Sequence, residues 1–433
     1  MAAVSKFVNN HRPNLDNYIE LYKHFHAHPE LSLNESQTAA KIVSTLQSIN
    51  SSLKITSGIG GHGLTAVHHN GSGPTILLRA DIDALPVKEL TGLPYASKAV
   101  MKDSSLPADH PDADKSKPLM HACGHDMHIT SLLACAELLT CAADAWRGTV
   151  IYLFQPAEEK GSGARAMVAD GLYEKIPVPD VVLGGHVMPF PAGRIGTTRG
   201  TAASSADSLA VTVYGRGGHA SQPQNLLDPV VLASSIVLRL QTLVSREVNP
   251  ADHAVCTVAS LQAGDADNVV ADEALLKVDL RAMNQDVRDR LAEGVRRIVK
   301  AECMASGCEK EPKFEVTRTF PLLVNGDEVM DRIENSFLDH FGDVDGYTGY
   351  AKDAAQLGGS EDFGELATAI NKPSCFWTYG GTPHDLWASA EKAGRIREEI
   401  PINHSAKFAP QIMPTLQVAI DAYAVAALTW LAK

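Results

Sequence analysis

The sequence predicts an α/β protein in which a mostly parallel sheet with helices on both faces carries an inserted, smaller α+β domain of βαββαβ order. Three observations predict this class. Short apolar runs alternate with helical patterns in the first part of the chain, and this rhythm changes near residue 205. The length of 433 residues suits two or three domains of about 150 residues.

The first part of the chain shows both periodicities that a helix-covered sheet requires. Leu15, Ile19, Tyr22 and Phe25 step along one face of a helix. Strands that are buried on both faces read as continuous apolar runs, because neither face meets water. Strands of this kind are predicted at residues 65–67, 75–78, 150–154, 181–183 and 374–379, and amphipathic helices at 129–142 and 164–173.

From about residue 205 the order becomes strand, helix, two strands, helix and strand. The first helix opens at Asp228-Pro229, an N-cap followed by proline at the first helical position. Residues 97–118 are rich in Ser, Pro, Asp and Lys and predict a long exposed loop. We place the inserted elements at 209–214, 228–246, 254–261, 274–281, 287–299 and 313–318, and the domain boundaries at 1–204, 205–319 and 320–433.

The composition excludes several classes of partner. Lysine and arginine total 38 against 51 aspartate and glutamate residues, a net charge of −13, so we expect neither nucleic acid nor an anionic membrane surface as a partner. Residues 418–432 are apolar but interrupted, and predict a packed alanine-rich helix. Seven thinly spread cysteines and the absence of a signal pattern in residues 1–17 favour free thiols and a cytoplasmic protein.

The densest cluster of chemically active side chains is the run His-Ala-Cys-Gly-His-Asp-Met-His at residues 121–128. Cys123 and His125 are two residues apart in a predicted loop, so both side chains can turn toward one metal ion. Asp126 would either cap the helix predicted from residue 129 or orient a ligand histidine. A surface loop that merely contains histidines is the alternative.

Other acidic and histidine side chains follow predicted strands. Glu158 and Glu159 come after the run 150–154, His186 follows 181–183, and Asp83 follows 75–78. The carboxyl ends of parallel strands meet at one sheet edge, where α/β proteins bind ligands. Alone, a Glu-Glu pair fits a solvated surface and a lone histidine fits a structural role. Together with His404 near the C-terminus, they predict a divalent-metal site.

A competing motif is a decoy. Gly58, Gly60 and Gly63 match G-x-G-x-x-G, but the residues after them read as a strand rather than the helix that a dinucleotide site requires. The sequence also lacks a G-x-S-x-G elbow, an H-E-x-x-H helix and a Walker A loop.

The motifs together resemble the amidohydrolase branch of the zinc aminoacylase/carboxypeptidase metallopeptidases, which includes hippurate hydrolases and plant auxin–amino acid conjugate hydrolases. The resemblance spans nearly the whole chain in family order. It is carried by residues 28–30, 78–86, 121–128, 154–159, 217–221 and 359–363.

The resemblance implies a ligand set for two divalent metal ions. Cys123 would bridge both ions. His125 and His186 would complete one coordination sphere, and Glu159 and His404 the other. Zinc suits a thiolate with imidazoles and a carboxylate, and manganese, cobalt or nickel could replace it.

The resemblance also implies roles at the substrate. Glu158 would be the general base and Asp83 an orienting carboxylate. The inserted domain would serve dimerisation and cover the substrate, with His219 reaching the site of another subunit in a homodimer. Asn268 and Arg281 match positions near the substrate carboxylate.

The implied reaction is hydrolysis of the amide bond of an N-acyl amino acid or a similar small amide. Two alternatives stay open at this point. The chain could be a dipeptidase or carboxypeptidase of the same family, or a metal-binding protein without catalysis.

Overall fold

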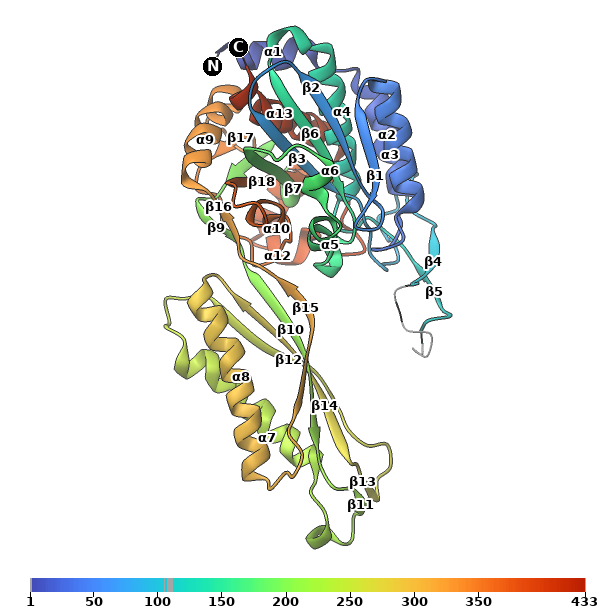
Figure 1. The fold of residues 1–433 in the computed structure, drawn as a ribbon, viewed down its shortest axis with the longest axis vertical. Coiled ribbons are helices and arrows are strands. Elements are labelled where there is room, and N and C mark those ends of the chain that lie inside the picture. Colours follow the sequence, from blue (N-terminus) through green and yellow to red (C-terminus); the bar gives the residue numbers. More distant parts are fainter. Residues whose placement is uncertain (1, 105, 107–111, 433) are drawn as a thin grey trace. The chain divides into compact units, whose positions relative to one another are not determined.

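The computed structural model describes residues 2–104, 106 and 112–432, and the chain folds as two compact units (Figure 1). The larger unit comprises Met1–Ala202, Val324–Gln356 and Asp362–Lys433, and the smaller comprises Ala203–Leu323 and Leu357–Glu361. The predicted boundaries lie a few residues from these. The short segment Leu357–Glu361 belongs with the smaller unit because Ser204 donates a backbone hydrogen bond to Leu357 (3.2 Å).

The larger unit is built on an eight-stranded sheet of order β1-β2-β6-β3-β7-β18-β8-β17. The central strands β6, β3, β7 and β18 run parallel, whereas β1, β2 and β8 pair antiparallel to β2, β6 and β18 respectively. This confirms the predicted mostly parallel sheet. The strands are β1 (Lys54–Ile59), β2 (Gly63–Asn70), β3 (Thr75–Asp81), β6 (Gly148–Gln155), β7 (Val181–Pro191), β8 (Arg194–Thr197), β17 (Gly349–Ala351) and β18 (Ser374–Thr382).

Helices cover both faces of this sheet because its strands are apolar on both sides. Ile76 and Leu78 of β3 join the core cluster that includes helices α4 and α13, while the equally buried Leu77 faces the opposite side. Helices α5 and α10 contact β6 and β7. The helices are α1 (Ala2–His11), α2 (Leu15–Ala27), α3 (Ser36–Ile49), α4 (His125–Cys141), α5 (Gly163–Ala169), α6 (Leu172–Lys175), α9 (Asp327–Phe341), α10 (Gly364–Thr368), α11 (His384–Ala393), α12 (Ile396–Glu399) and α13 (Ile412–Leu431).

Two predicted helices differ from the structure. Helix α4 begins at His125 rather than Ile129, and it is buried nearly all round rather than amphipathic, because other helices cover its outer side. The helix predicted at residues 164–173 is two short helices, α5 and α6, which are separated at Gly171. This glycine has a φ of +75°, a left-handed conformation that ends the first helix.

Helix α13 is long and apolar enough to cross a membrane by length and composition alone. However, 72% of its most apolar window is buried inside the protein, and it packs against α4, α9 and the sheet. Its apolar composition therefore serves the core, as predicted for residues 418–432.

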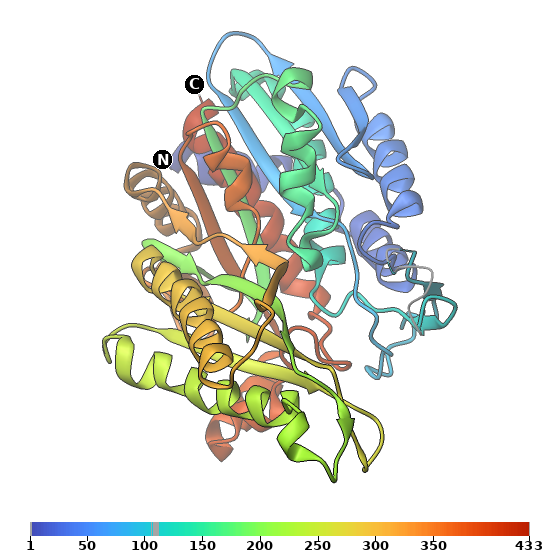
Figure 2. The same cartoon turned by 60° about the horizontal axis from the view of Figure 1, so that its bottom comes forward.

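The smaller unit is a four-stranded antiparallel sheet of order β12-β14-β10-β15, with two helices on one face (Figure 2). The observed order confirms the predicted βαββαβ pattern, and Asp228 caps its first helix by accepting a hydrogen bond from Val230 N (2.8 Å). The elements are β10 (Ser205–Tyr214), α7 (Pro229–Thr242), β12 (Ala254–Gln262), β14 (Glu273–Ala282), α8 (Gln285–Ala305) and β15 (Lys313–Phe320), with a small extra pair of β11 (Gly218–His219) and β13 (Val269–Val270).

Two further strand pairs and four short turns of helix complete the described part of the chain. Within the predicted loop 97–118, strands β4 (Val100–Lys102) and β5 (Ser116–Pro118) pair as a hairpin, so this stretch is more ordered than predicted; residues 105 and 107–111 lie outside the described part. Strands β9 (Gly200–Ala203) and β16 (Leu323–Asn325) pair with each other. Short turns of helix are η1 (Ala143–Ala145), η2 (Glu158–Lys160), η3 (Pro223–Asn225) and η4 (Leu243–Glu247).

Candidate metal centre

Three predicted ligands come together in the larger unit. Ligand atoms of Cys123, His125 and Glu159 lie within 4.8 Å of one another. Cys123 lies in the loop before α4, His125 is the first residue of that helix, and Glu159 lies in the turn η2 after β6. The loop before α4 and the turn after β6 lie at the same edge of the sheet. Side chains that are distant in the sequence therefore meet here.

The other two predicted ligands border this cluster. His186 Nε2 lies 3.5 Å from Cys123 Sγ, and His404 Nε2 lies 3.3 Å from Glu159 Oε2. His186 is buried, whereas the His404 side chain is 54% exposed. His186 therefore contacts the cysteine sulfur, and His404 contacts the carboxylate of Glu159, so both histidines border the three clustered ligands.

The position of His186 differs from the prediction that it follows a strand. It lies inside β7, and its ring Nδ1 is 2.7 Å from the backbone oxygen of Val187. A proton on Nδ1 donates to that oxygen, which leaves the lone pair of Nε2 toward Cys123. Gly185 marks a close approach rather than a turn, since a Cβ there would lie 2.1 Å from Trp377 Nε1.

Glu158 and Glu159 lie in a 3₁₀ turn directly after the strand that they were predicted to follow. The preceding Ala157 has a φ of +49°, and its backbone N–H donates to Glu35 Oε1 (2.9 Å). This tight turn directs both carboxylates toward the same centre. Glu158 Oε2 lies 4.0 Å and Glu159 Oε1 lies 3.8 Å from His125 Nε2.

Asp83 contacts both Glu159 and His125, an arrangement that would suit the orienting role implied for it. One carboxylate oxygen accepts hydrogen bonds from Ser32 Oγ (2.6 Å) and Glu159 N (3.1 Å). The other lies 3.3 Å from His125 Nδ1, which is also 2.9 Å from the backbone oxygen of Asp83. His125 Nδ1 is thereby held as a donor, and Nε2 points to the cluster.

The electrostatics of the cluster favour a cation. Burial lowers the pKa of His125, but Asp81 and Asp83 outweigh it and raise that pKa to about 10. Burial, Glu159 and Glu158 raise the pKa of the Cys123 thiol well above its usual value. A positive charge among these side chains therefore stabilises the ionised carboxylates. A metal ion would supply that charge, and it would also lower the pKa of the Cys123 thiol so that the sulfur is kept as a thiolate.

Unpartnered buried atoms also fit metal ions. Within the described residues, His125 Nε2 and Glu159 Oε1 are buried without a hydrogen-bond partner. Leaving such atoms unpaired costs about 1–3 kcal/mol each. Coordination would remove that cost, so these residues fit a metal site.

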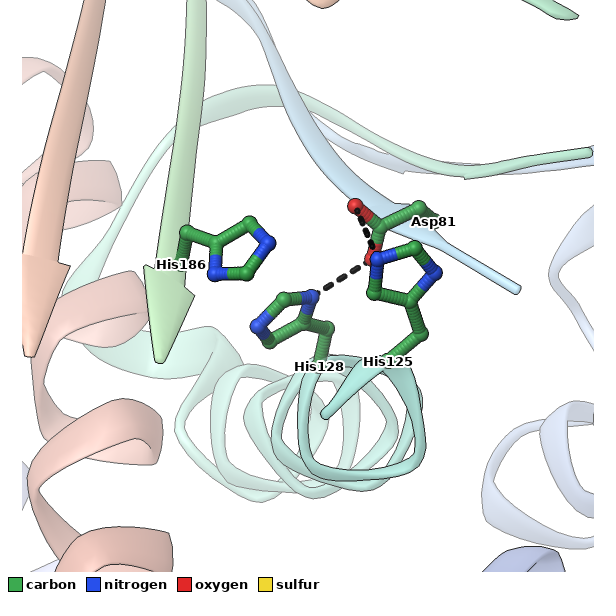
Figure 3. Close-up of side chains that lie close together, drawn as sticks. All are labelled: Asp81, His125, His128 and His186. Atoms are coloured by element: carbon green, nitrogen blue, oxygen red, sulfur yellow. Dashed lines mark hydrogen bonds and ion pairs between the residues drawn. The ribbon is translucent and has the colours of Figure 1, made fainter. Parts of the chain in front are cut away.

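A second group of potential ligands shares His125 with this cluster (Figure 3). It consists of Asp81, His125, His128 and His186. His128 Nδ1 lies 2.5 Å from Asp81 Oδ1, and His128 Nε2 accepts from Val187 N (2.9 Å). Both ring nitrogens of His128 are engaged, so it is a structural support rather than a ligand. Sequence reasoning assigned no role to this pair, although the spacing of His125 and His128 places both on one helix face.

Asp126 has neither predicted role. Gly124 is the N-cap of α4, because the helix starts earlier than predicted and places Asp126 in its first turn. Its carboxylate instead binds His26 Nδ1 (2.7 Å), whose Nε2 lies 3.0 Å from Glu89 Oε1. Burial lowers the pKa of His26, but hydrogen bonds to Asp126 and Glu89 raise it to about 9. No local sequence pattern indicates this buried triad.

The predicted residues of the smaller unit are more exposed. His219 lies in β11, and its Nδ1 accepts a hydrogen bond from Ser221 N (3.1 Å). The neutral ring therefore carries its proton on Nε2. Asn268 is exposed just before β13, and its backbone oxygen accepts from Ala220 N (3.0 Å).

Arg281 lies at the other end of the smaller unit's sheet. Its guanidinium binds Asp279 Oδ1 (3.0 Å) and Ser360 Oγ (3.3 Å). Asp272, which binds Gly217 N (2.9 Å) beside β11, is separated from Arg281 by the length of β14, roughly 30 Å at about 3.3 Å per residue. Asn268 and Arg281 therefore lie far apart within one chain, and their expected place near the substrate carboxylate stays a prediction.

Comparisons with known proteins agree with the motifs. The model of peptidase family M20/M25/M40 matches residues 77–398. The hippurate hydrolase of Campylobacter jejuni is 36% identical and the match covers 78% of this chain and 82% of that protein. Thermostable carboxypeptidase 2 of Saccharolobus solfataricus is 31% identical, with 77% and 80% covered.

A solved structure shows the same fold. A dinuclear metal-binding peptidase of the M20 family from Bacillus subtilis superposes with a TM-score of 0.71 at 27% identity, covering 95% of this chain and 97% of that one. The family resemblance inferred from the motifs is confirmed, and with it the hydrolase class. The chain belongs to peptidase family M20/M25/M40.

Proposed function

We propose that this hydrolase cleaves the amide bond of N-acyl amino acids, or of small amides that resemble them, with two divalent metal ions. The observation that carries the proposal is the buried carboxylate of Glu158, 4.0 Å from His125 Nε2 at the edge of the ligand cluster. A carboxylate beside the ligands, but outside the proposed ligand set, is placed to act as general base. The relative named for hippurate, an acylated glycine, supports this substrate class.

We assign the metal ligands as the resemblance implies. Cys123 would be shared by both ions, His125 and His186 would complete one set, and Glu159 and His404 the other. When bound, the ions would polarise the scissile carbonyl and lower the pKa of a water molecule. The thiolate, imidazole and carboxylate donors favour zinc, while manganese, cobalt and nickel accept the same ligand types.

Glu158 would take a proton from the attacking water and deliver it to the leaving nitrogen. Its position in the tight turn after β6 supports this, because the strained backbone at Ala157 fixes where the carboxylate points. Asp83 would keep His125 in the tautomer that ligates through Nε2.

His219 would stabilise the oxyanion from a second copy of the chain. Its Nε2–H is free to donate because Nδ1 accepts from Ser221 N, and donors aimed at an oxyanion are worth 10²–10³ in rate. The smaller unit offers apolar surface for a homodimer: Val231 and Leu238 on α7 are 62% and 73% exposed. Strand β12 is an edge strand whose outer side pairs with no described strand.

We propose that Asn268 and Arg281 contact the substrate carboxylate from different copies. Their separation along the sheet of the smaller unit supports this division. Arg281 keeps a partly exposed guanidinium, fixed by Asp279, which suits a bidentate contact with a carboxylate.

Hydrolysis assays with N-benzoyl and N-acetyl amino acids and with dipeptides test the function. The protein should be assayed as purified, after dialysis against a chelator, and after adding zinc or manganese back. We expect release of the acyl acid, loss of activity with the metal, and recovery on reloading. Undiminished activity after removal of metal, verified by elemental analysis, would contradict the proposal.

Carboxypeptidase activity is the second candidate, because one relative carries that name. Both reactions break an amide beside a free carboxylate, so the same site could serve either. A higher kcat/KM for dipeptides than for N-acyl amino acids would favour this candidate.

We also propose that the protein works in a reducing compartment such as the cytoplasm. Its bridging role requires Cys123 as a reduced thiolate. All seven cysteines of the chain are free in the structure.

A further inference from the structure

We infer that Asn403 is a positioning residue of the metal centre, which joins the loop of His404 to the Cys123 loop and to strand β7. It would also donate a hydrogen bond to the sulfur that bridges the ions. The inference rests on the proposed metal-binding function, and it assigns a role to a residue that has no ligand chemistry of its own.

The amide nitrogen of Asn403 faces three acceptors. It lies 3.2 Å from the backbone oxygen of Cys123, 3.2 Å from that of Val187 and 3.7 Å from Cys123 Sγ. An amide nitrogen carries two hydrogens, so one can bind a carbonyl while the other is directed at the sulfur. One side chain thus contacts the segments of two other proposed ligands.

The carbonyl of Val187 links this amide to His186. It is the same oxygen that lies 2.7 Å from His186 Nδ1 and sets the tautomer of that ring. Removing the Asn403 amide would leave this oxygen with one donor fewer, and would free the His404 loop from β7. Asn403 therefore acts on the ligands of both proposed ions.

His404 depends on such hydrogen bonds for its position more than the other proposed ligands do. Its side chain is 54% exposed, so packing does not hold it, and its φ of +69° is a left-handed conformation that a non-glycine residue adopts at a cost. Two contacts fix its backbone: its own N–H donates to Ala122 O (2.8 Å), and the neighbouring Asn403 amide binds Cys123. These contacts hold His404 Nε2 opposite Glu159.

The N–H beside the sulfur also has an electrostatic consequence. The ligand atoms of Cys123 and Glu159 lie within 4.8 Å of each other, and a carboxylate at that distance opposes a thiolate. A donor directed at the sulfur offsets part of that repulsion and withdraws electron density from the sulfur. Such outer partners of ligands typically change metal affinity by 10–100-fold.

Cobalt(II) titration of full-length protein tests the inference, because a thiolate ligand gives a near-ultraviolet charge-transfer band. Asn403→Leu keeps the side-chain size and removes both N–H donors. Asn403→Asp, the second variant should the first misfold, replaces the donors by oxygen. Ser405→Ala in the same loop is the matched control, since its hydroxyl accepts only from Lys407 N among the hydrogen bonds described.

We expect wild type and Ser405→Ala to bind two cobalt ions with one charge-transfer band. In Asn403→Leu and Asn403→Asp, one ion should bind about 10–100-fold more weakly, and the band should shift in energy. Unchanged affinities and an unchanged band in a folded Asn403 variant would overturn the inference. A wild-type protein without a cobalt–thiolate band would overturn the proposed metal site itself, and the inference with it.

Discussion

The larger and the smaller unit hold their polar residues in opposite ways. In the larger unit, Cys123, His125 and His186 are buried among carboxylates at contact distances. In the smaller unit, His219 and Asn268 are exposed at one end of a sheet whose other end holds Arg281. The first group can act on an ion within one chain, whereas Arg281 lies too far from His219 and Asn268 within one chain to contact one small molecule together with them.

This difference follows from what burial costs. Burying several ionisable groups is expensive unless partners or a metal ion compensate. The larger unit accepts that cost at one sheet edge, which marks it as a binding site. Exposed residues of the smaller unit cost little to keep, because water solvates them. Variants of each unit should therefore affect different measurements.

The largest effect is expected from Glu158. Glu158→Gln should retain metal and lower kcat by at least ~10²-fold, because the proton acceptor is gone. Glu159→Gln, its neighbour in the same turn, should also weaken one metal ion. Steady-state kinetics at saturating metal and elemental analysis separate the two outcomes. Near-normal turnover of Glu158→Gln would assign the base to another group.

The next effect distinguishes the cysteines of the two units. Cys123→Ala should lose most bound metal, since its sulfur is proposed to contact both ions. Cys303→Ala, in the core of the smaller unit, is the control and should keep the wild-type content. Elemental analysis after gel filtration measures both. Equal metal in both variants would refute the bridging role.

A smaller effect concerns pH and the buried triad of His26. The pKa of His26 is raised to about 9 in the folded protein, above its unfolded value of about 6.5. Protonated His26 therefore stabilises the folded protein, and this contribution to the free energy of unfolding is fully present below pH ~6.5. It is lost as the pH rises through about 9. The loss should be on the order of 3 kcal/mol.

Urea unfolding between pH 6 and 10 measures this contribution as the difference between wild type and His26→Gln. The difference should shrink over that range. His253→Gln, which replaces an exposed histidine of the smaller unit, is the matched control for the substitution itself. A difference that stays constant with pH would mean that folding does not raise the pKa of His26.

The grouping of Cys123, His125 and Glu159 in the larger unit could be predicted from the sequence, because these residues lie in or next to loops and turns that adjoin the strands. The apolar runs located β3, β6 and β7, and their following side chains converge as parallel topology requires. The place of His186 inside β7 was hidden, since two preceding glycines also fit a turn. The partner of Asp126 lies a hundred residues away at His26, which no local pattern reveals.

The smaller unit shows the complementary limit. Its βαββαβ order follows from apolar alternation and the Asp228-Pro229 cap, and was predicted correctly. The separation of Asn268 from Arg281 depends on strand register and length, which fix distances that a list of motifs does not contain. Asn403 was missed for a related reason, because its contacts form only after three distant segments fold together.

The central claim is that a complete site needs the larger unit of one chain and His219 of another. Glu158→Gln and His219→Ala proteins, each nearly inactive, should be mixed and allowed to exchange subunits. Random exchange makes about half of the dimers hybrids. One site in each hybrid then has an intact Glu158 and receives a normal His219.

Activity after exchange is the deciding measurement, with hybrid formation verified by mass spectrometry of differently tagged chains. The account predicts a rise to roughly a quarter of wild type, since about half of the dimers regain one of their two sites. If His219 acted within its own chain, every hybrid site would carry one lesion. Proven exchange with activity at the mean of the two variants would contradict the account.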